Sequence, residues 1–196
     1  MPGMKRNWGF TLIELLVVIS VVGILAALVV PGFTSFIRDN RLTSQINTLI
    51  GAVHFARGEA ANRRSIVTLC ASSDSTTCDT SNWEAGWIIF TDSNGDEIVN
   101  GSDEILLVQE ALEGNTSLRT SGFNFSGAGL FQYAATGFML ASDPQAGTFT
   151  LCDDQGAASA RAIVINISGV SRLATDENSD GIVNNHTGST GNISCP

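Results

Sequence analysis

The stretch GFTLIELLVVISVVGILAALVVP, from Gly9 to Pro31, carries a single charged residue, Glu14. As an α-helix, Phe10 to Val30 would extend about 32 Å, which is enough to cross the hydrocarbon core of a bilayer. The run is too long for the apolar part of a secretory signal peptide, and no small-x-small cleavage site follows it. We therefore predict a transmembrane helix over residues 10–30, with a buried core helix as the alternative.

Basic residues lie on one side of this run only. Lys5 and Arg6 precede it, whereas no Lys or Arg occurs between Phe10 and Ile37. Positive charge favours the cytoplasmic side of a membrane helix, so we expect a cytoplasmic N-terminus and a chain body outside the cytoplasm.

The helical pattern continues beyond Pro31 but becomes one-sided. We predict one helix over Phe10–Asn62, with an amphipathic half at residues 31–62 and with Gly23 and Pro31-Gly32 as places where it can bend. Apolar residues recur there at helical spacing, at Leu42, Ile46, Leu49, Ile50, Val53 and Ala60.

Short strands are predicted beyond residue 63, bounded by Gly, Ser, Asn and Asp. Because the amphipathic helix face needs a partner, we predict an α+β fold in which the long N-terminal helix packs on an antiparallel sheet. The segment 72–82 and the tail after Thr175 are predicted to be polar loops that do not pack, and no internal repeat is found. The predicted strands are Ser65–Cys70, Gly86–Asp92, Glu104–Glu110, Gly147–Cys152 and Arg161–Ile167.

The four cysteines, Cys70, Cys78, Cys152 and Cys195, form no C-x-x-C pair. With only two histidines in the chain, they indicate two disulfides in an oxidising compartment rather than a metal site. Three pairings remain open, and free thiols are the alternative. We favour Cys70–Cys78, which closes a short loop, and Cys152–Cys195, which anchors the C-terminal end.

The net charge of the chain is −9. An acidic body of this kind is a poor non-specific partner for nucleic acid or for an anionic membrane surface.

Glu14 is unfavourable in a membrane helix unless something compensates its charge, because inserting an acid costs about 2.5–3.5 kcal/mol at the bilayer centre. A cut before Phe10 would create an α-amino group four residues from Glu14. Opposite charges 4 Å apart attract by about 4 kcal/mol at an effective dielectric constant of 20, so the amine of a neighbouring subunit could offset that cost. The alternatives are a snorkelling or structurally idle acid, and a pair between the amine and the acid of one chain, since an acid near a helix N-terminus is favourable.

The motif G-F-T-L-I-E at Gly9–Glu14, after a short basic leader, resembles the class III signal of type IV prepilins and type II secretion pseudopilins. The resemblance implies cleavage of a leader, residues 1–9, after Gly9, N-methylation of Phe10 and a subunit-pairing role for Glu14. It also implies a pilin-like fold, a prepilin peptidase as partner, and a helix that can melt between Gly23 and Pro31 on assembly.

The segments GWIIFTDSNGDE (86–97), DEILLVQE (103–110) and ARAIVINISG (160–169) resemble the FimT/GspH branch of minor pilins and pseudopilins. This resemblance implies a periplasmic head over residues 63–196. It predicts a minor pilin, anchored in a bacterial inner membrane, that joins or primes a type IV pilus with other pilins. The alternatives are a type II secretion pseudopilin H and a DNA-binding uptake pilin.

Some FimT-type pilins bind DNA through a basic G-R-x-R-like element. The corresponding stretch here is Gly169-Val170-Ser171-Arg172, which keeps only the last arginine and precedes an acidic segment. Arg161 and Arg172 are the candidate phosphate contacts, and the charge disfavours DNA as a partner.

Two segments resemble calcium loops, which place oxygen ligands at alternating positions. The first segment begins at Asp92, and in it Glu97 replaces the glycine of the turn. The second begins at Asp176, and its twelfth position is Thr187, which cannot supply the acid that a calcium loop has there. Solvated Asx turns are the alternative for both. The candidate ligands are Asp92, Asn94, Asp96 and Asp103 in the first segment, and Asp176, Asn178, Asp180, the Ile182 carbonyl and Asn184 in the second.

Catalysis has little support in the sequence. The sequence has no G-x-S-x-G elbow, no phosphate-binding glycine loop and no H-E-x-x-H. His54 and His186 are interpreted as ordinary polar positions. We therefore predict a protein that is not an enzyme and, calcium apart, has no cofactor.

Overall fold

The computed structural model describes residues 9–79, 82–123, 129–140 and 145–196. Helix α1 (Leu12–Arg63) is one element of 52 residues that runs unbroken through Gly23 and Pro31. It corresponds to the helix predicted over 10–62. Contacts divide the chain into an N-terminal unit that ends at Asn40 and a C-terminal unit that begins at Arg41, and α1 contributes to both.

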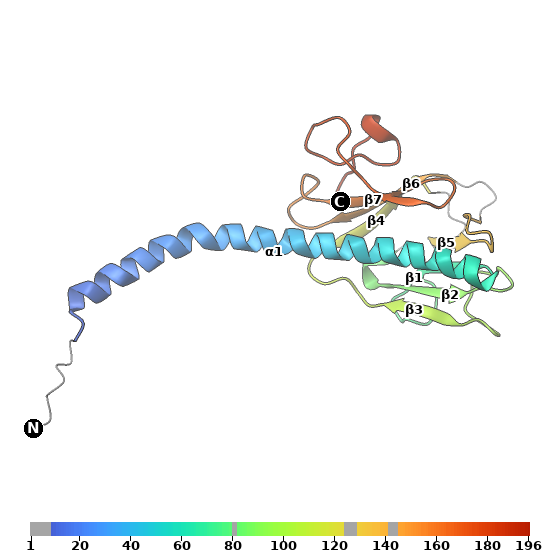
Figure 1. Ribbon diagram of the computed structural model, residues 1–196, viewed down its shortest axis with the longest axis horizontal. Helices are drawn as coiled ribbons and strands as arrows, with labels where there is room; N and C mark the ends of the chain where they lie inside the picture. The colour runs from blue at the N-terminus through green and yellow to red at the C-terminus, as the bar shows by residue number, and fades with distance from the viewer. Residues whose placement is uncertain (1–8, 80–81, 124–128, 141–144) are drawn as a thin grey trace, which may run out of the picture. The chain divides into compact units, whose positions relative to one another are not determined.

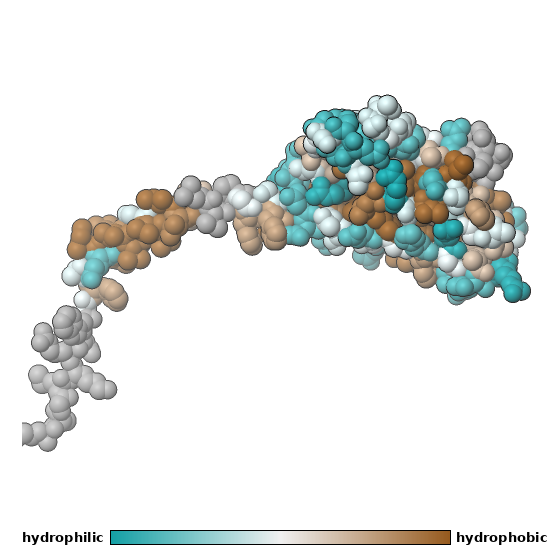
Figure 2. Space-filling view, turned by 45° about the horizontal axis from the view of Figure 1, so that its top comes forward, coloured by the Kyte–Doolittle hydropathy of each residue, from teal (hydrophilic) through white to brown (hydrophobic). Residues whose placement is uncertain are grey.

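In the N-terminal unit, the apolar side chains of α1 are exposed. Leu12 is 76% exposed and Leu25 is 56% exposed, and Figure 2 shows a mostly hydrophobic surface on the part of the helix that precedes the grey atoms. The helix is long and apolar enough to cross a membrane by length and composition.

The C-terminal unit contains two four-stranded antiparallel sheets beside its part of α1 (Figure 1). Sheet A has the order β3-β2-β1-β5 and sheet B the order β4-β6-β7-β8. Two short 3-10 helices, η1 (Trp83–Ala85) and η2 (Gly188–Thr190), lie in the connections. The strands are β1 (Val67–Ala71), β2 (Trp87–Thr91), β3 (Ile105–Gln109), β4 (Ser117–Ser121), β5 (Leu130–Tyr133), β6 (Gly147–Cys152), β7 (Arg161–Ile165) and β8 (Ser171–Leu173).

The α+β class and the packing of the helix on antiparallel strands are confirmed. The five predicted strands correspond to β1, β2, β3, β6 and β7. Sequence analysis missed β4, β5 and β8, and it expected one sheet where there are two. The missed strands have three to five residues, and two of them, SLRTS and SRL, contain few apolar residues. The alternation of apolar and polar side chains is therefore too brief to identify them as strands.

The main core lies between α1 and both sheets. Its helix residues follow the predicted i, i+3, i+4 stripe, and Trp83 packs edge-on against Phe149 with 4.9 Å between ring centroids. Phe131 of sheet A stacks on Phe149 of sheet B at 5.8 Å, which makes the two sheets share one core. The buried helix residues are Leu42, Ile46, Leu49, Ala52, Val53, Ala56 and Ala60.

Each sheet also has a small apolar cluster away from this core. Cys70, Ile88 and Phe90 form the cluster of sheet A, against which Val99 packs. The cluster of sheet B contains Cys152, Ala160, Ala162 and Ile193, with Ile182 and Val183 packed against it.

The tail after Thr175 differs from its prediction as an unpacked loop. Ile193 is 5% exposed and Asn184 is 1% exposed. The disulfide from Cys152 to Cys195 holds the tail on sheet B, so a sequence rich in polar residues is nevertheless packed.

Candidate functional site

The N-terminal motif is exposed where the structure describes it. Phe10 is 92% exposed, and no atom lies within 4 Å of the position that a Cβ of Gly9 would occupy. The rest of the predicted leader, with Lys5 and Arg6, lies outside the described residues. The Gly9–Phe10 bond is thus open to another molecule on the described side.

Glu14 has a local partner that sequence analysis missed. Thr11 directly precedes α1, and its backbone N–H and hydroxyl donate to Glu14 Oε2 at 2.9 and 3.0 Å. The backbone N–H of Glu14 donates back to the Thr11 hydroxyl at 3.3 Å. This reciprocal pair is a capping box, whose signature T-x-x-E is readable in the sequence. The acid therefore has a helix-capping role besides any role in pairing subunits.

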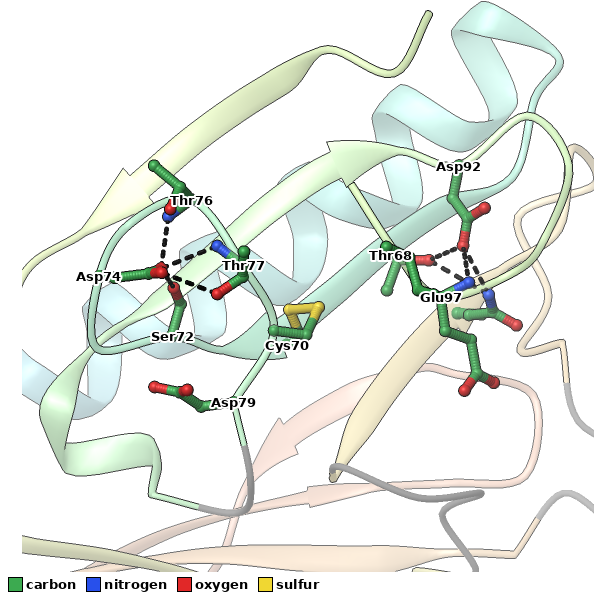
Figure 3. Close-up of a disulfide and its surroundings, with 12 residues drawn as sticks. Thr68, Cys70, Ser72, Asp74, Thr76, Thr77, Asp79, Asp92 and Glu97 are labelled. Atoms are coloured by element: carbon green, nitrogen blue, oxygen red, sulfur yellow. Dashed lines mark hydrogen bonds between the residues drawn. A yellow bond between two sulfur atoms is a disulfide. The ribbon is translucent and has the colours of Figure 1, made fainter. Parts of the chain in front are cut away.

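The structure joins Cys70 to Cys78 and Cys152 to Cys195, the pairing favoured from the sequence. The eight-residue separation of the first pair closes a polar loop over sheet A (Figure 3). Inside it, Asp74 accepts hydrogen bonds from the backbone N–H groups of Thr76 and Thr77, both at 2.8 Å, and from the Thr77 hydroxyl. These donors hold the pKa of the Asp74 carboxyl well below its usual range.

The loop between β2 and β3 begins with a buried carboxylate. Asp92 is completely buried, and its Oδ2 accepts hydrogen bonds from the Thr68 hydroxyl at 2.8 Å and from Gln132 Nε2 at 2.9 Å. The backbone N–H groups of Asp96 and Glu97 donate to the same carboxylate at 3.1 and 3.0 Å. In Figure 3, Asp92 lies at the end of the β1–β2 pair opposite to the disulfide loop. Asp92, the first candidate calcium ligand, is thus buried and already bonded to four donors of the protein.

The loop that begins at Asp176 repeats this geometry. The backbone N–H groups of Asp180 and Gly181 donate to the Asp176 carboxylate at 3.2 and 2.8 Å. Asn178 Nδ2 donates to Asp180 Oδ2 at 3.0 Å, and Ile182 N–H donates to Asp180 Oδ1 at 2.9 Å. The matching bonds in the first loop, from Asn94 and Ile98 to Asp96, measure 2.7 and 3.0 Å.

The prediction of no internal repeat is therefore wrong for these loops. DSNGDEIVN (92–100) and DENSDGIVN (176–184) are identical at six of nine positions. At the sixth position Glu97 has φ = 68° and Gly181 has φ = 88°, so the glutamate adopts the turn conformation that favours glycine. Both segments were related to the calcium-loop pattern from the sequence, and the shared hydrogen bonds show that they also repeat one another.

The remaining predicted ligands are used within the protein. Asn184 Oδ1 accepts from the backbone of Glu177 at 2.6 Å, and Asn184 Nδ2 donates to Asn192. Asp103 accepts from the backbone of Ser93 and Asn100, each at 3.2 Å. Among the described residues, no group of three or more His, Cys, Asp or Glu side chains is placed to hold a metal ion.

The two candidate DNA contacts do not form a basic cluster. Arg161 Nη1 donates to the carbonyl groups of Ser159 and Ala160 at 2.9 and 3.3 Å. Arg172 forms an ion pair with Glu177 at 3.3 Å. Each guanidinium thus has a partner within the chain, although β7 and β8 are neighbours.

The histidines contact hydroxyl groups. His54 Nε2 lies 3.4 Å from the Ser171 hydroxyl, and His186 Nδ1 lies 3.0 Å from the Thr148 hydroxyl. The backbone N–H of His186 also donates to Thr148 at 2.8 Å, which helps to hold the tail on β6.

Comparison with known families identifies both parts of the chain. Residues 45–169 match the family described as Type II transport protein GspH, and residues 4–30 match the prokaryotic N-terminal methylation motif. A curated relative, prepilin peptidase-dependent protein D of Escherichia coli (strain K12), is 40% identical over 47 residues. That match covers 24% of this chain and 32% of the relative, so the chain spans about a third of that relative's length.

Solved structures show a related fold. The crystal structure of the type IV minor pilin FimU of Pseudomonas aeruginosa (strain PAO1) covers 71% of this chain and 92% of its own, with a TM-score of 0.55 and 20% identity. The minor pseudopilin EpsH from the type II secretion system of Vibrio cholerae covers 68% of this chain and 95% of its own, with a TM-score of 0.46 and 9% identity. The FimU match supports the pilin-like fold.

Proposed function

We propose that this chain, which belongs to the GspH family of type II transport proteins, is a filament subunit. The family and the N-terminal methylation motif make it a minor pilin or pseudopilin. A prepilin peptidase would cut after Gly9, and Phe10 would become the methylated N-terminus. The mature chain would join, or prime, a helical filament of the type IV pilus.

The observation that carries this proposal is the exposed apolar surface of α1 behind the N-terminal motif. Ile13 is 66% exposed and Ile24 is 64% exposed. An apolar surface of this length is stable only in lipid or against other apolar helices. A bacterial inner membrane would hold it before assembly, with the N-terminus in the cytoplasm and the head in the periplasm, and neighbouring subunits would cover it afterwards.

The proposed organisation keeps the boundaries predicted from sequence. Residues 1–9 form the leader, 10–30 the membrane and assembly helix, 31–62 its amphipathic continuation, and 63–196 the head. Within the filament, Glu14 would pair with the Phe10 amine of a neighbouring subunit, which offsets the cost of the buried acid.

Two substitutions separate the capping role of Glu14 from the pairing role. Glu14→Gln keeps a side-chain acceptor at the third helical position but removes the charge. Thr11→Val keeps the charge and removes the hydroxyl part of the cap, leaving the backbone N–H bond to Glu14. We expect both variants to be processed and inserted into the membrane. Immunoblots of sheared filaments should show that only Glu14→Gln loses incorporation, and normal incorporation of Glu14→Gln would contradict subunit pairing.

The filament system is distinguished by deleting the gene. If the protein primes a type IV pilus, electron microscopy should show loss of surface pili, restored by the intact gene. Unchanged pili with lost exoprotein secretion would support the type II secretion pseudopilin. DNA uptake is disfavoured by the internal partners of Arg161 and Arg172 and is excluded if the protein does not bind DNA at low salt.

Calcium binding by the two repeated loops is a second proposal for the same head. Both loops place an Asp, an Asn and an Asp at alternating positions, and both hold the first Asp through two backbone N–H donors. Oxygen ligands at such spacing suit Ca²⁺. Val99 of the first loop and Val183 of the second pack against the small apolar cluster of their own sheet. A bound ion that orders each loop would therefore also stabilise its attachment to that sheet.

A further inference from the structure

Three buried polar side chains meet on sheet A, at the pair of strands β1 and β5. Thr68 of β1 and Gln132 of β5 lie directly opposite each other in the antiparallel register, and Asp92 follows the last residue of β2. Thr68 and Asp92 are fully buried, and Gln132 is 8% exposed. Figure 3 shows the Thr68 hydroxyl and the Asp92 carboxylate facing each other. A hydroxyl, a carboxylate and a carboxamide are thus held together away from water.

The three groups lie within hydrogen-bond distance of one another. The Thr68 hydroxyl donates to Asp92 Oδ2 at 2.8 Å, and Gln132 Nε2 donates to the same oxygen at 2.9 Å. Gln132 Nε2 also donates to Thr68 Oγ1 at 3.3 Å. One carboxylate oxygen therefore contacts both the proton of the hydroxyl and the nitrogen of the carboxamide.

These groups are the parts of an acyl transfer. A threonine hydroxyl is a weak nucleophile until an adjacent base accepts its proton, and the Asp92 carboxylate is placed to be that base. The backbone N–H groups of Asp96 and Glu97 donate to the same carboxylate at 3.1 and 3.0 Å, so its orientation is fixed. The Gln132 carboxamide supplies a carbonyl carbon to attack and a nitrogen that can leave once it has gained a proton.

We propose that Thr68 and Gln132 become joined by an ester bond. Asp92 accepts the proton of the Thr68 hydroxyl as Oγ1 bonds to Cδ of Gln132, and it then passes this proton to Nε2. The Cδ–Nε2 bond breaks, and the nitrogen leaves as ammonia. One alcohol and one amide thus give one ester and one ammonia, without an oxidant, a reductant or a further reactant. Asp92 is regenerated, and each chain reacts once, on itself.

The strand register suits the product. Directly opposed residues of an antiparallel pair have Cβ atoms about 4.5–5.5 Å apart. The ester would join the two Cβ atoms through Oγ1 of Thr68 and through Cδ and Cγ of Gln132, which is a bridge of similar length. The sheet holds the two groups together, so that no bimolecular encounter is needed. Burial excludes the water that would hydrolyse the ester, whereas the ammonia is lost to solution.

The bond would reinforce the strand that follows the long helix. β1 is the first strand after α1, so a force that pulls on the helix reaches the head through β1. Thr68 and Gln132 are 64 residues apart in the chain, and the ester would tie β1 covalently to β5. Like a disulfide, such a cross-link restricts the unfolded chain. The inference goes beyond the proposed filament role and depends neither on it nor on calcium.

Intact mass spectrometry of the purified full chain in EDTA tests the proposal. The mass should be about 17 Da, the mass of one ammonia, below the mass calculated for the sequence with its two disulfides. After proteolysis, the peptides that contain Thr68 and Gln132 should be recovered as one cross-linked species. Hydroxylamine, which cleaves esters and leaves amides intact, should separate the two peptides.

Variants locate the reaction. Thr68→Val and Asp92→Asn should keep their full calculated mass, because the first lacks the nucleophile and the second lacks the base. Thr68→Ser retains a hydroxyl and should again lose ammonia. Thr91→Val is the matched control: Thr91 is also a buried threonine of sheet A, but its hydroxyl accepts from the Glu104 N–H at 2.7 Å. This variant should lose ammonia as the wild type does.

A wild-type chain at its full calculated mass would overturn the proposal. A loss of about 17 Da that persists in Thr68→Val would also overturn it, because cyclisation of an asparagine, as at Asn94-Gly95, releases ammonia too. If Asp92→Asn does not fold, the pair Thr68→Val and Thr68→Ser, which leaves Asp92 in place, decides the question alone.

Discussion

The hydroxyl of Tyr133 on β5 donates a hydrogen bond to the carbonyl of Gly169 in the β7–β8 turn, across 2.8 Å. The bond joins sheet A to sheet B within the C-terminal unit. Burial raises the pKa of the Tyr133 hydroxyl, so it stays a donor at every physiological pH.

Gly169→Ala should break this connection. Gly169 has φ = 79°, and a Cβ there would lie 2.5 Å from Tyr133 Cε1. Backbone strain and overpacking together should lower the free energy of unfolding by about 2–3 kcal/mol. Gly156→Ala is the matched control, because Gly156 has φ = 81° and nothing within 4 Å, and it should cost only about 1 kcal/mol. Urea unfolding followed by tryptophan fluorescence measures both, and equal losses would contradict the steric argument.

The two disulfides should differ in their effect on stability. On the chain-entropy account, the 43-residue separation of Cys152 and Cys195 corresponds to about 4 kcal/mol, and the eight-residue separation of Cys70 and Cys78 to about 2.5 kcal/mol. Cys152→Ala/Cys195→Ala should therefore destabilise the protein more than Cys70→Ala/Cys78→Ala. It should also expose the tail around Ile193 to limited proteolysis, which the second variant should not. The opposite order of stabilities would show that the tail is held chiefly by its other contacts.

Asp74→Asn should weaken the disulfide loop in a pH-dependent way. Because hydrogen bonds lower the folded pKa below the ordinary 3.8, ionised Asp74 contributes stability that is full above that value. The contribution is lost as pH falls through the folded pKa. The difference in melting temperature between wild type and variant should thus be constant near neutral pH and shrink below about pH 4. A difference that does not change between pH 7 and pH 2 would contradict the assignment.

Calcium should stabilise the head if the repeated loops bind it. At a free calcium concentration 100 times the dissociation constant, the free energy of unfolding should rise by about 2.7 kcal/mol per site. Asp96→Asn and Asp180→Asn should each remove part of this gain. Magnesium at the same concentration should raise the free energy of unfolding by less than calcium does. Identical melting curves in calcium and in EDTA would show that the loops are stable Asx turns without an ion.

Glu97→Gly should stabilise the first loop. Glu97 holds φ = 68°, a conformation that is strained for a side chain and free for glycine. We expect a gain of about 1 kcal/mol in the free energy of unfolding, and no comparable gain for Glu97→Ala. A loss of stability in Glu97→Gly would mean that the Glu97 side chain contributes more than the backbone strain costs.

Patterns that depend on neighbouring residues were readable from the sequence. The apolar stripe of α1 and the membrane-length run follow from helical periodicity, and five strands follow from short apolar segments between turn residues. The N-terminal motif likewise depends on six consecutive residues. The T-x-x-E cap of α1 spans only four consecutive residues, so it belongs to the same readable class.

Tertiary structure alone decided how distant segments meet. The division into two sheets depends on β4, β5 and β8, which are too short for a period to show and form because partner strands complete their hydrogen bonds. The packing of the tail, the matched geometry of the Asp92 and Asp176 loops, and the meeting of Tyr133 with Gly169 all join residues far apart in the chain. The spacing of apolar residues along the chain does not reveal such contacts, because the burial and hydrogen bonding that stabilise them exist only in the folded protein.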